Sequence, residues 1–224
     1  NGVLDIINSI EHIVEINYVD VHSSFNHKSV ISFDTLLDNE GSSPKFEQLP
    51  FNHPLYIMYS SGTTGPPKSI IHSAGGTLIQ HMKEHQLHCD IQSGKDKIFW
   101  FTTCGWMMWN WLISVLASKA SIVLFDGFPM YKRDDLLLKI ANKENITLFG
   151  VSAKYIDTLR KTKKNFKKVH KLEKLRTICS TGSPLSSDCF KFVYNNIKKN
   201  VHLASISGGT DIVSCFVLGN LYQP

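Results

Sequence analysis

A regular alternation of short apolar runs with helix-like stretches, beginning at Leu55, is the feature that most constrains how this chain can fold. Each apolar run is short enough to be a buried strand, and each intervening stretch has helical patterning. The predicted strands are residues 55–58, 98–101, 121–125, 146–149, 177–179 and 202–206. The predicted helices are residues 74–88, 106–118, 133–143, 153–164 and 186–198. Strand and helix in alternation predict an α/β fold of mostly parallel sheets flanked by helices.

The segment before Leu55 is weakly patterned and gives less definite predictions. Residues 2–10 are compatible with a helix, and residues 12–19 alternate like a strand. Residues 39–44 contain Gly, Ser and Pro and predict a surface loop.

The composition is that of a chain with a substantial core, because 42% of its 224 residues are hydrophobic. No apolar run approaches the ~20 residues of a membrane-spanning helix. The chain does not begin with a basic region followed by an apolar core, which is the pattern of a signal peptide. It starts without Met and stops at Pro224 without an evident closing element, so we expect a fragment of a larger domain.

The five cysteines are widely spaced, and no two form a Cys-x-x-Cys pair. They are Cys89, Cys104, Cys179, Cys189 and Cys215. An odd number without metal-site spacing predicts buried free thiols in a reducing compartment, here the cytosol.

The net charge of +5 is concentrated in residues 160–176. A basic run of this kind attracts nucleic acid or phosphates. Phe166 is its single aromatic residue, and no recognition motif accompanies it. We therefore expect a solvated helix end and loop, and no nucleic-acid partner.

A loop of hydroxyls, glycines and one lysine follows the first predicted strand. It reads Ser60, Ser61, Gly62, Thr63, Thr64, Gly65, Pro66, Pro67 and Lys68. Glycines let the backbone approach an anion, hydroxyls and free N–H groups donate to phosphate oxygens, and the lysine adds positive charge. The loop therefore predicts a polyphosphate site that handles ATP.

The spacing of this loop excludes a Walker A motif. That motif needs four residues between its glycines and then Gly-Lys-Ser/Thr. Here two residues separate Gly62 from Gly65, and two prolines separate Gly65 from Lys68.

Two further loops of small residues, 180–185 and 205–211, follow later predicted strands. The carboxyl ends of parallel strands meet at one edge of a sheet, where α/β proteins bind ligands. The three loops are therefore expected to form one site. The first of the two also predicts a helix capped by Ser186 or Ser187.

Residues 99–111 contain all four tryptophans. Helical spacing predicts that Trp106, Trp109 and Asn110 share one face. Core packing is expected for Trp100 and Trp111.

Four polar residues, His81, Glu84, His85 and His88, lie at helical spacing in the first predicted helix. Histidines that share a helix face can hold a metal ion. The interleaved lysine and glutamine and the absence of a His-Glu-x-x-His order favour an exposed polar helix face.

The loop from Ser60 to Lys68 resembles the signature of the adenylate-forming superfamily, which includes acyl-CoA synthetases, luciferases and adenylation domains. Ser69 stands where that family usually has Gly. The second loop resembles its Gly-x-x-Pro-Leu segment, and the third its aromatic-Gly-x-Thr-Glu motif. Ser207 replaces the aromatic residue of that motif, which leaves open what stacks on adenine.

The resemblance implies a role for each matching residue. Lys68, Thr210 and Asp211 are the implied catalytic residues, with Asp211 also associated with magnesium. The implied nucleotide site comprises Ser60, Ser61, Gly62, Thr63, Thr64, Gly65, Lys68, Gly182, Ser183, Pro184, Ser205, Ile206, Ser207, Gly208, Gly209 and Thr210. The implied acyl pocket comprises Cys104, Trp106, Gly150, Val151 and Ser152, and a Trp there favours a small carboxylate.

The resemblance also implies an ATP-dependent ligase that uses Mg²⁺ and coenzyme A. Within the superfamily, residues 99–111 and 207–216 are most similar to the members that activate acetoacetate. Acetyl- or propionyl-CoA synthetases are the nearest alternative, and a truncated, non-catalytic nucleotide-binding protein is the alternative from another class. The chain is expected to be part of the N-terminal AMP-binding domain, without the C-terminal domain and its catalytic lysine. Oligomeric state is left open.

Overall fold

A computed structural model describes residues 7, 9–18, 30–37, 41, 43–60 and 65–222. The chain divides into two compact units, residues 1–48 and 49–224. In the first unit, β1 (Ile13–Glu15) pairs in parallel with β2 (Val30–Ser32), and α1 (Phe33–Leu37) follows. The strand predicted at 12–19 is confirmed only at residues 13–15, whereas most of the helix predicted at 2–10 lies outside the described residues.

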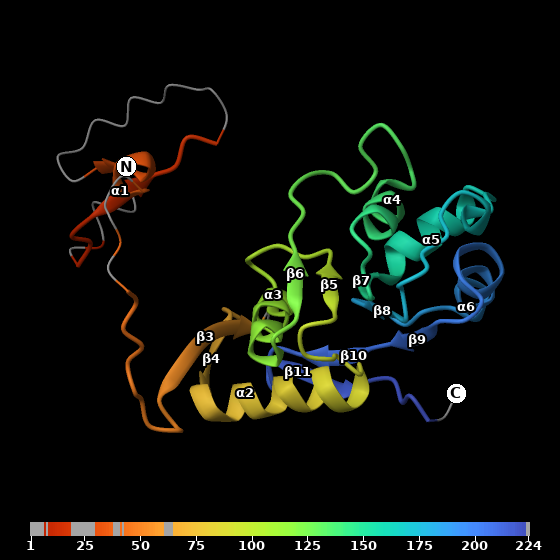
Figure 1. The fold of residues 1–224 in the computed structure, drawn as a ribbon. Coiled ribbons are helices and arrows are strands. Elements are labelled where there is room, and N and C mark those ends of the chain that lie inside the picture. Colours follow the sequence, from red (N-terminus) through yellow and green to blue (C-terminus); the bar gives the residue numbers. More distant parts are fainter. Residues whose placement is uncertain are drawn as a thin grey trace. The chain divides into compact units, whose positions relative to one another are not determined.

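The centre of the second unit is a five-stranded parallel sheet in the order β6-β5-β7-β8-β9 (Figure 1). Its strands are β5 (Lys97–Trp100), β6 (Ser121–Val123), β7 (Leu148–Ser152), β8 (Thr177–Thr181) and β9 (His202–Ser205). Five of the six predicted strands are therefore confirmed as parallel, with small shifts at their ends. The predicted α/β class is confirmed as well.

Helices cover both faces of this sheet (Figure 1). Alternate side chains of β5 show why. Phe99 packs into the cluster built by α4 (Leu136–Lys143), α5 (Ala153–Lys161) and α6 (Ser187–Phe192). Ile98 and Trp100 pack into the cluster that includes α3 (Met107–Ser114). Strands buried on both faces are apolar at nearly every position, which is how these runs read in the sequence.

The five predicted helices are confirmed in position, and three of them continue at their C-terminal end as a π-helical or 3-10 turn. They are α2 (Ala74–Lys83) with the π-helical η1 (Glu84–His88), α3 (Met107–Ser114) with the 3-10 turn η2 (Val115–Ser118), α4 (Leu136–Lys143), α5 (Ala153–Lys161), and α6 (Ser187–Phe192) with the π-helical η4 (Val193–Ile197). Ser186 caps α6, because its hydroxyl accepts the Cys189 N–H at 3.3 Å, and this prediction is confirmed. Ser152 caps α5 in the same way.

Two segments differ from the parallel pattern, and these are corrections. The first predicted strand is β3 (Pro54–Ser60), which pairs antiparallel with β4 (Lys68–Ser73) outside the five-stranded sheet. Lys68 therefore begins a strand and does not lie in the loop. The third predicted loop contains β10 (Ser207–Gly209), which pairs antiparallel with β11 (Ser214–Val217).

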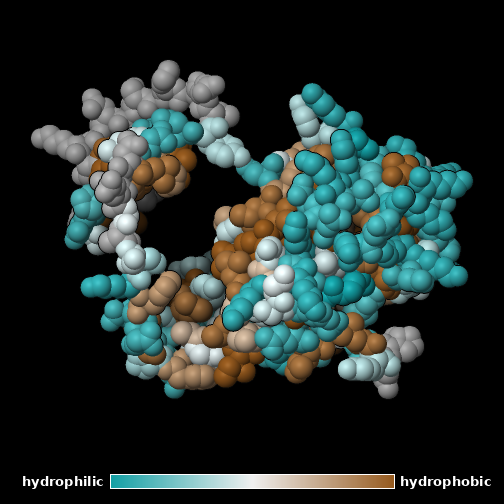
Figure 2. Space-filling model, in the orientation of Figure 1, coloured by the Kyte–Doolittle hydropathy of each residue, from teal (hydrophilic) through white to brown (hydrophobic). Residues whose placement is uncertain are grey.

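The basic run is exposed as predicted at most of its lysines, in the segment around the 3-10 turn η3 (Phe166–Lys168). Figure 2 shows hydrophilic residues gathered over α4, α5 and α6. Arg176 is also exposed, and its guanidinium donates to both carboxylate oxygens of the buried Asp96, at 2.7 and 2.9 Å.

The cysteines are free thiols, and four of them are buried. Cys104 is exposed, which corrects the prediction of burial for that residue. No helix within the described ranges is long and apolar enough to cross a membrane.

Candidate functional site

The loops after β8 and β9 meet at the carboxyl edge of the sheet and enclose a cavity of about 310 Å³, the Gly182 cavity. Its lining consists of Thr181, Gly182, Ser183, Pro184, Ser205, Ile206, Ser207 and Gly208. The Ile206 N–H donates to the Ser180 carbonyl at 2.7 Å, and the Leu185 N–H donates to the Ser205 hydroxyl at 3.3 Å. Two of the three loops that the sequence singles out therefore share one cavity.

Glycine is required at two positions of these loops for different reasons. Gly182 has φ of +88°, a conformation that side chains disfavour, although the space around it is open. At Gly208, a Cβ would lie 2.1 Å from the Ser214 carbonyl oxygen. That second glycine permits the close approach of β10 and β11.

The turn that joins β10 to β11 contains Thr210 and Asp211. The Nε2–H of His72, in β4, donates to the Thr210 carbonyl at 2.7 Å. This hydrogen bond connects the turn to the strand that begins with Lys68. Residues 61–64 of the first loop lie outside the described residues, whereas Gly65 and Lys68 are exposed and Ser60 pairs with Lys68 in the hairpin.

A second cavity, of about 370 Å³, lies between β3 and the start of α3; we call it the Thr210 cavity. Thr210, Cys104, Gly105, Met107 and Asn110 line it together with residues 55–59. A third cavity, of about 460 Å³, is the Trp100 cavity. It is lined by Trp100, Thr102, Thr103, Cys104, Trp109, Leu112, Leu124, Phe125 and Asp126.

The linings of the three cavities are connected, either by a shared residue or by residues close together in the chain. Gly208 lines the first and Thr210, two residues later, lines the second. Cys104 lines both the second and the third. The linings therefore place the Gly182 loop, the Thr210 turn and Trp100 beside successive cavities.

The residues expected to form the acyl pocket are only partly brought together. Cys104 lines two cavities, and Gly150 lies under Trp100, where a Cβ would meet the indole at 2.2 Å. Val151 is buried in the core, and Ser152 caps α5. Trp106 is 60% exposed and precedes α3 as its N-cap, so it does not share a helix face with Trp109 and Asn110.

The turn offers oxygen ligands that fit Mg²⁺. Asp211 is exposed, and among the described residues no cationic side chain pairs with its carboxylate. Carboxylate oxygens and water are the ligands that Mg²⁺ takes beside phosphates. The Asp211 carboxylate is therefore available to a cation of this kind.

Three of the four polar residues singled out in α2 and η1 are buried and His88 is half-buried, which corrects the prediction of an exposed polar face. His81, Glu84 and His85 are at most 1% exposed. The Glu84 carboxylate accepts from the Trp111 indole N–H at 2.9 Å and from the Cys215 N–H at 3.1 Å. Its partners come from residues about 27 and 130 positions further along the chain, a pairing that local sequence does not reveal.

Burial shifts the proton equilibria of both histidines in this cluster. It lowers the pKa of His85 to about 3, with the neighbouring His81 lowering it further. Burial also lowers the pKa of His81, against the opposing effect of its hydrogen bond to the Val213 carbonyl. Both rings are therefore neutral near pH 7, and the Nε2 atom of His81 bears the hydrogen that it donates to Val213 at 2.6 Å.

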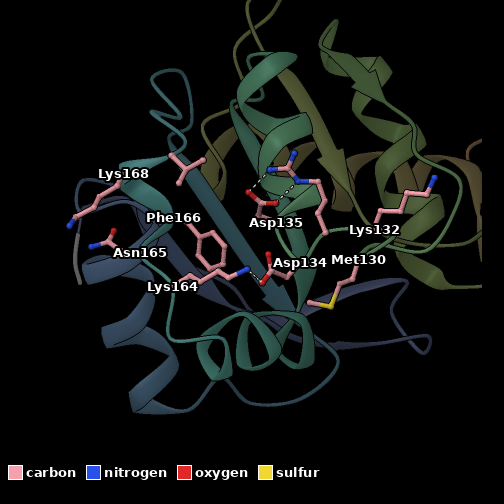
Figure 3. Close-up of a pocket in the computed structure, with 10 residues that line it drawn as sticks. Met130, Lys132, Asp134, Asp135, Lys164, Asn165, Phe166 and Lys168 are labelled. Atoms are coloured by element: carbon pink, nitrogen blue, oxygen red, sulfur yellow. Dashed lines mark hydrogen bonds and ion pairs between the residues drawn. The ribbon is translucent and has the colours of Figure 1, made fainter.

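A fourth cavity, of about 740 Å³, lies elsewhere, between the start of α4 and the segment after α5 (Figure 3). Its two carboxylates are already paired. Asp135 binds Arg133 at 2.5 and 2.8 Å and His170 at 2.7 Å, and Asp134 binds Lys164 at 2.5 Å. The Arg133 guanidinium, and then His170, hold the pKa of Asp135 well below its usual range. None of the residues predicted from the sequence motifs lines this cavity, whose ion pairs crosslink two loops.

Comparison with known proteins agrees with this geometry. The AMP-binding enzyme family matches residues 7–221. The acetoacetyl-coenzyme A synthetase of Rhizobium meliloti (strain 1021) is 59% identical over 179 residues, which cover 80% of this chain and 27% of that protein. The acetoacetyl-CoA synthetase of Gallus gallus is 48% identical over 224 aligned residues, covering 96% of this chain and 33% of that protein.

A solved structure extends the agreement to three dimensions. The acetoacetyl-CoA synthetase from Streptomyces lividans superposes with a TM-score of 0.85 at 38% identity, covering 93% of this chain and 32% of that one. The chain thus spans between about a quarter and a third of the length of these relatives. Together with the loops at the carboxyl edge of the sheet, the match over nearly the whole chain shows that it belongs to the AMP-binding enzyme family.

Proposed function

We propose that the protein containing this chain is an ATP-dependent ligase that joins acetoacetate to coenzyme A, giving acetoacetyl-CoA, AMP and pyrophosphate. The observation that supports it most directly is the run of adjoining cavities from Gly182 past Thr210 to Trp100. It matches the order of a base, an α-phosphate and an acyl group in an acyl-adenylate. The relatives named acetoacetyl-CoA synthetase support the choice of acid.

In this proposal, adenine occupies the Gly182 cavity and the α-phosphate lies beside Thr210. The acyl group extends past Cys104 into the Trp100 cavity, whose lining of Trp100, Trp109 and Phe125 is compact and largely apolar. The Trp100 and Trp109 indoles in this lining would shorten the space for an acyl chain and so favour a short acid.

The first step needs charge stabilisation more than covalent catalysis. A carboxylate oxygen attacks the α-phosphorus, a new P–O bond forms, and pyrophosphate leaves. Lys68 and the Thr210 hydroxyl stabilise the charge that grows on the phosphate oxygens. Magnesium, when bound at Asp211, supplies further neutralisation of the phosphates. His72 keeps the Thr210 turn against β4 and so orients these groups.

The second step replaces AMP by coenzyme A. The thiolate attacks the acyl carbon, the new C–S bond forms, and AMP leaves with the electron pair of the C–O bond. We propose that residues outside these 224 contribute to this step and that this chain is part of the N-terminal domain. The fraction of the relatives' length that it spans supports this view. The free thiols support a reducing compartment, the cytosol.

Carboxylate-dependent ATP–pyrophosphate exchange on the intact protein tests the proposal. Acetoacetate, acetate, propionate, butyrate and a long-chain fatty acid would be compared at equal concentrations. We expect the highest kcat/KM with acetoacetate. Faster exchange with acetate or propionate would contradict the choice of acid and keep the adenylation chemistry. Nucleotide binding without exchange for any acid would contradict the ligase proposal.

A further inference from the structure

The Thr210–Asp211 turn is followed by a strained residue that buried side chains hold in place. Val213 has φ of +49°, which is rare for a β-branched residue. It is 2% exposed, and its carbonyl accepts the Nε2–H of His81 at 2.6 Å. Backbone of this kind persists only where the surrounding structure over-determines it, and it is concentrated at functional sites.

The next two residues are held by a single carboxylate from the π-helical turn η1. The Ser214 hydroxyl and the Cys215 N–H both donate to Oε1 of Glu84, the latter at 3.1 Å. Gln80, one turn earlier, donates to the Ser214 hydroxyl at 2.9 Å. Gln80, His81 and Glu84 therefore bind three successive residues after the turn.

The same carboxylate reaches a second element. Its Oε2 atom accepts the Trp111 indole N–H at 2.9 Å, so Glu84 connects β11 with α3. Lys83 lies 3.7 Å from Oε1 and offsets part of the charge. A buried carboxylate is a costly way to fill core space, because an apolar side chain needs no partners. The contacts of Glu84 are directional, and they are made to the segment that carries Thr210 and Asp211.

The segment that makes these contacts also begins with Lys68. β4, α2 and η1 are consecutive, and four of their side chains bind residues 210–215: His72, Gln80, His81 and Glu84. Lys68 and the Thr210–Asp211 turn are thereby fixed to one continuous element. Figure 1 shows α2 lying along the β10–β11 hairpin.

We propose that His81 and Glu84 are positioning residues, which set the Thr210–Asp211 turn relative to Lys68 for magnesium-bound ATP. The inference rests on the proposed function, because it assigns the phosphate and magnesium roles to that turn and that lysine. Neither residue touches substrate. Each acts through the backbone of residues 213–215.

A matched pair of variants separates positioning from plain stability. Ser214→Ala and Trp111→Phe each remove one donor to Glu84, the first from the hairpin and the second from α3. His81→Phe removes the donor to the Val213 carbonyl. In the intact protein, without carboxylate, ATP affinity would be measured by calorimetry in EDTA and in excess Mg²⁺, with melting temperatures alongside.

We expect magnesium to tighten ATP binding in the wild type, and we call the ratio of the ATP Kd in EDTA to that in excess Mg²⁺ the magnesium gain. That gain should shrink about tenfold in His81→Phe, which loses the hydrogen bond to the Val213 carbonyl, and about threefold in Ser214→Ala, because the Cys215 N–H still donates to Glu84 in that variant. Trp111→Phe should lower the melting temperature and leave the magnesium gain unchanged. Equal magnesium gains in all variants, or an equal loss in Trp111→Phe and Ser214→Ala, would overturn the inference. A wild-type affinity that ignores magnesium would overturn it as well.

This binding measurement stays informative if the proposed function fails. A wild type that binds magnesium-ATP and shows no exchange with any acid would contradict the ligase and leave the comparison of variants valid. Normal pyrophosphate exchange in the wild type, together with wild-type magnesium gains in His81→Phe and Ser214→Ala, would contradict the positioning role alone.

Discussion

The residues that we propose to face the ligand and the buried residues that hold the Thr210–Asp211 turn differ in exposure and in how the sequence reveals them. Lys68, Gly65 and Asp211 are exposed and have few internal partners. His81 and Glu84 are buried and make hydrogen bonds to residues far along the chain. The first group has to remain free to meet a substrate, and the second has to be satisfied internally. Substitutions in the first group should therefore affect activity more than stability, and substitutions in the second group should affect stability more strongly.

Lys68→Ala should show the largest effect and should affect activity alone. Loss of one group that stabilises transition-state charge costs about 10²–10³-fold in rate, or about 2.7–4 kcal/mol. The exposed side chain begins β4 and is not part of the core, so the free energy of unfolding should change by no more than about 0.5 kcal/mol. Pyrophosphate exchange and urea unfolding on the same preparation would measure both.

Lys97 offers a matched control, because it is an exposed lysine at the start of β5. Lys97→Ala should leave both measurements unchanged. An exchange rate for Lys68→Ala within a factor of a few of the wild type would remove Lys68 from the proposed mechanism.

Gly150→Ala should combine the two kinds of effect at the position where the core meets the Trp100 cavity. A Cβ there would lie 2.2 Å from two carbons of the Trp100 indole, which must move into the cavity it lines. Overpacking of this kind costs about 1–3 kcal/mol of stability. The displaced ring should also raise the KM for the carboxylate more than the KM for ATP.

Gly105→Ala provides the control for this change, because the nearest atom to its Cβ would be the Thr103 hydroxyl oxygen at 4.0 Å. It should fold with nearly wild-type stability. If Gly150→Ala leaves stability and the carboxylate KM unchanged, the packing of Trp100 against β7 does not shape the acyl pocket.

Much of the fold was predictable because parallel strands leave a local signal. Residues buried on both faces make apolar runs such as 98–101 and 146–149, and the strands β5 and β7 lie within a residue or two of those runs. The hairpin β3–β4 was not predictable from periodicity, because the run at 55–58 reads the same whether its partner is parallel or antiparallel.

The meeting of the loops around the Gly182 cavity was predictable for a related reason. Gly182, Ser207 and Thr210 belong to short motifs, and the carboxyl ends of β8 and β9 bring their loops to one edge. The buried network was not predictable. His81, Glu84 and His85 alternate with Lys83 and Gln86 and so read as an exposed face, and their burial depends on β11, which lies about 130 residues further on.

Acid should lower the free energy of unfolding through the buried His85. Burial lowers its folded-state pKa to about 3, from 6.5 in the unfolded chain. Below pH 6.5 the unfolded state binds the extra proton, so the stability present at neutral pH is lost as the pH falls towards 3. The slope is at most about 1.4 kcal/mol per pH unit, or about 2 kcal/mol at pH 5.

Urea unfolding between pH 8 and pH 5 would measure this effect. His85→Phe keeps an aromatic ring beside Trp111, whose centroid lies 4.3 Å from that of His85, and should flatten the slope. His53→Gln, at an exposed histidine, should leave it unchanged. Parallel slopes for wild type and His85→Phe would show that His85 titrates normally.

Thiol labelling should give the smallest energetic effect and the clearest contrast between exposed and buried residues. Cys104 is exposed, whereas Cys89, Cys179, Cys189 and Cys215 are buried. Burial also raises the pKa of the Cys215 thiol, so little of its reactive thiolate forms. A maleimide should therefore modify Cys104 quickly in the native protein, and the rapid phase should be missing from Cys104→Ser.

Cys104 also lines both the Thr210 cavity and the Trp100 cavity, so a bound acyl-adenylate should shield it. Acetoacetate and ATP added together should slow the labelling more than either alone. Peptide mass spectrometry would identify the modified residue at each time point. Equal protection by ATP alone would mean that the acyl group does not pass Cys104, and rapid labelling of Cys89 or Cys215 would mean that the buried network opens readily in solution.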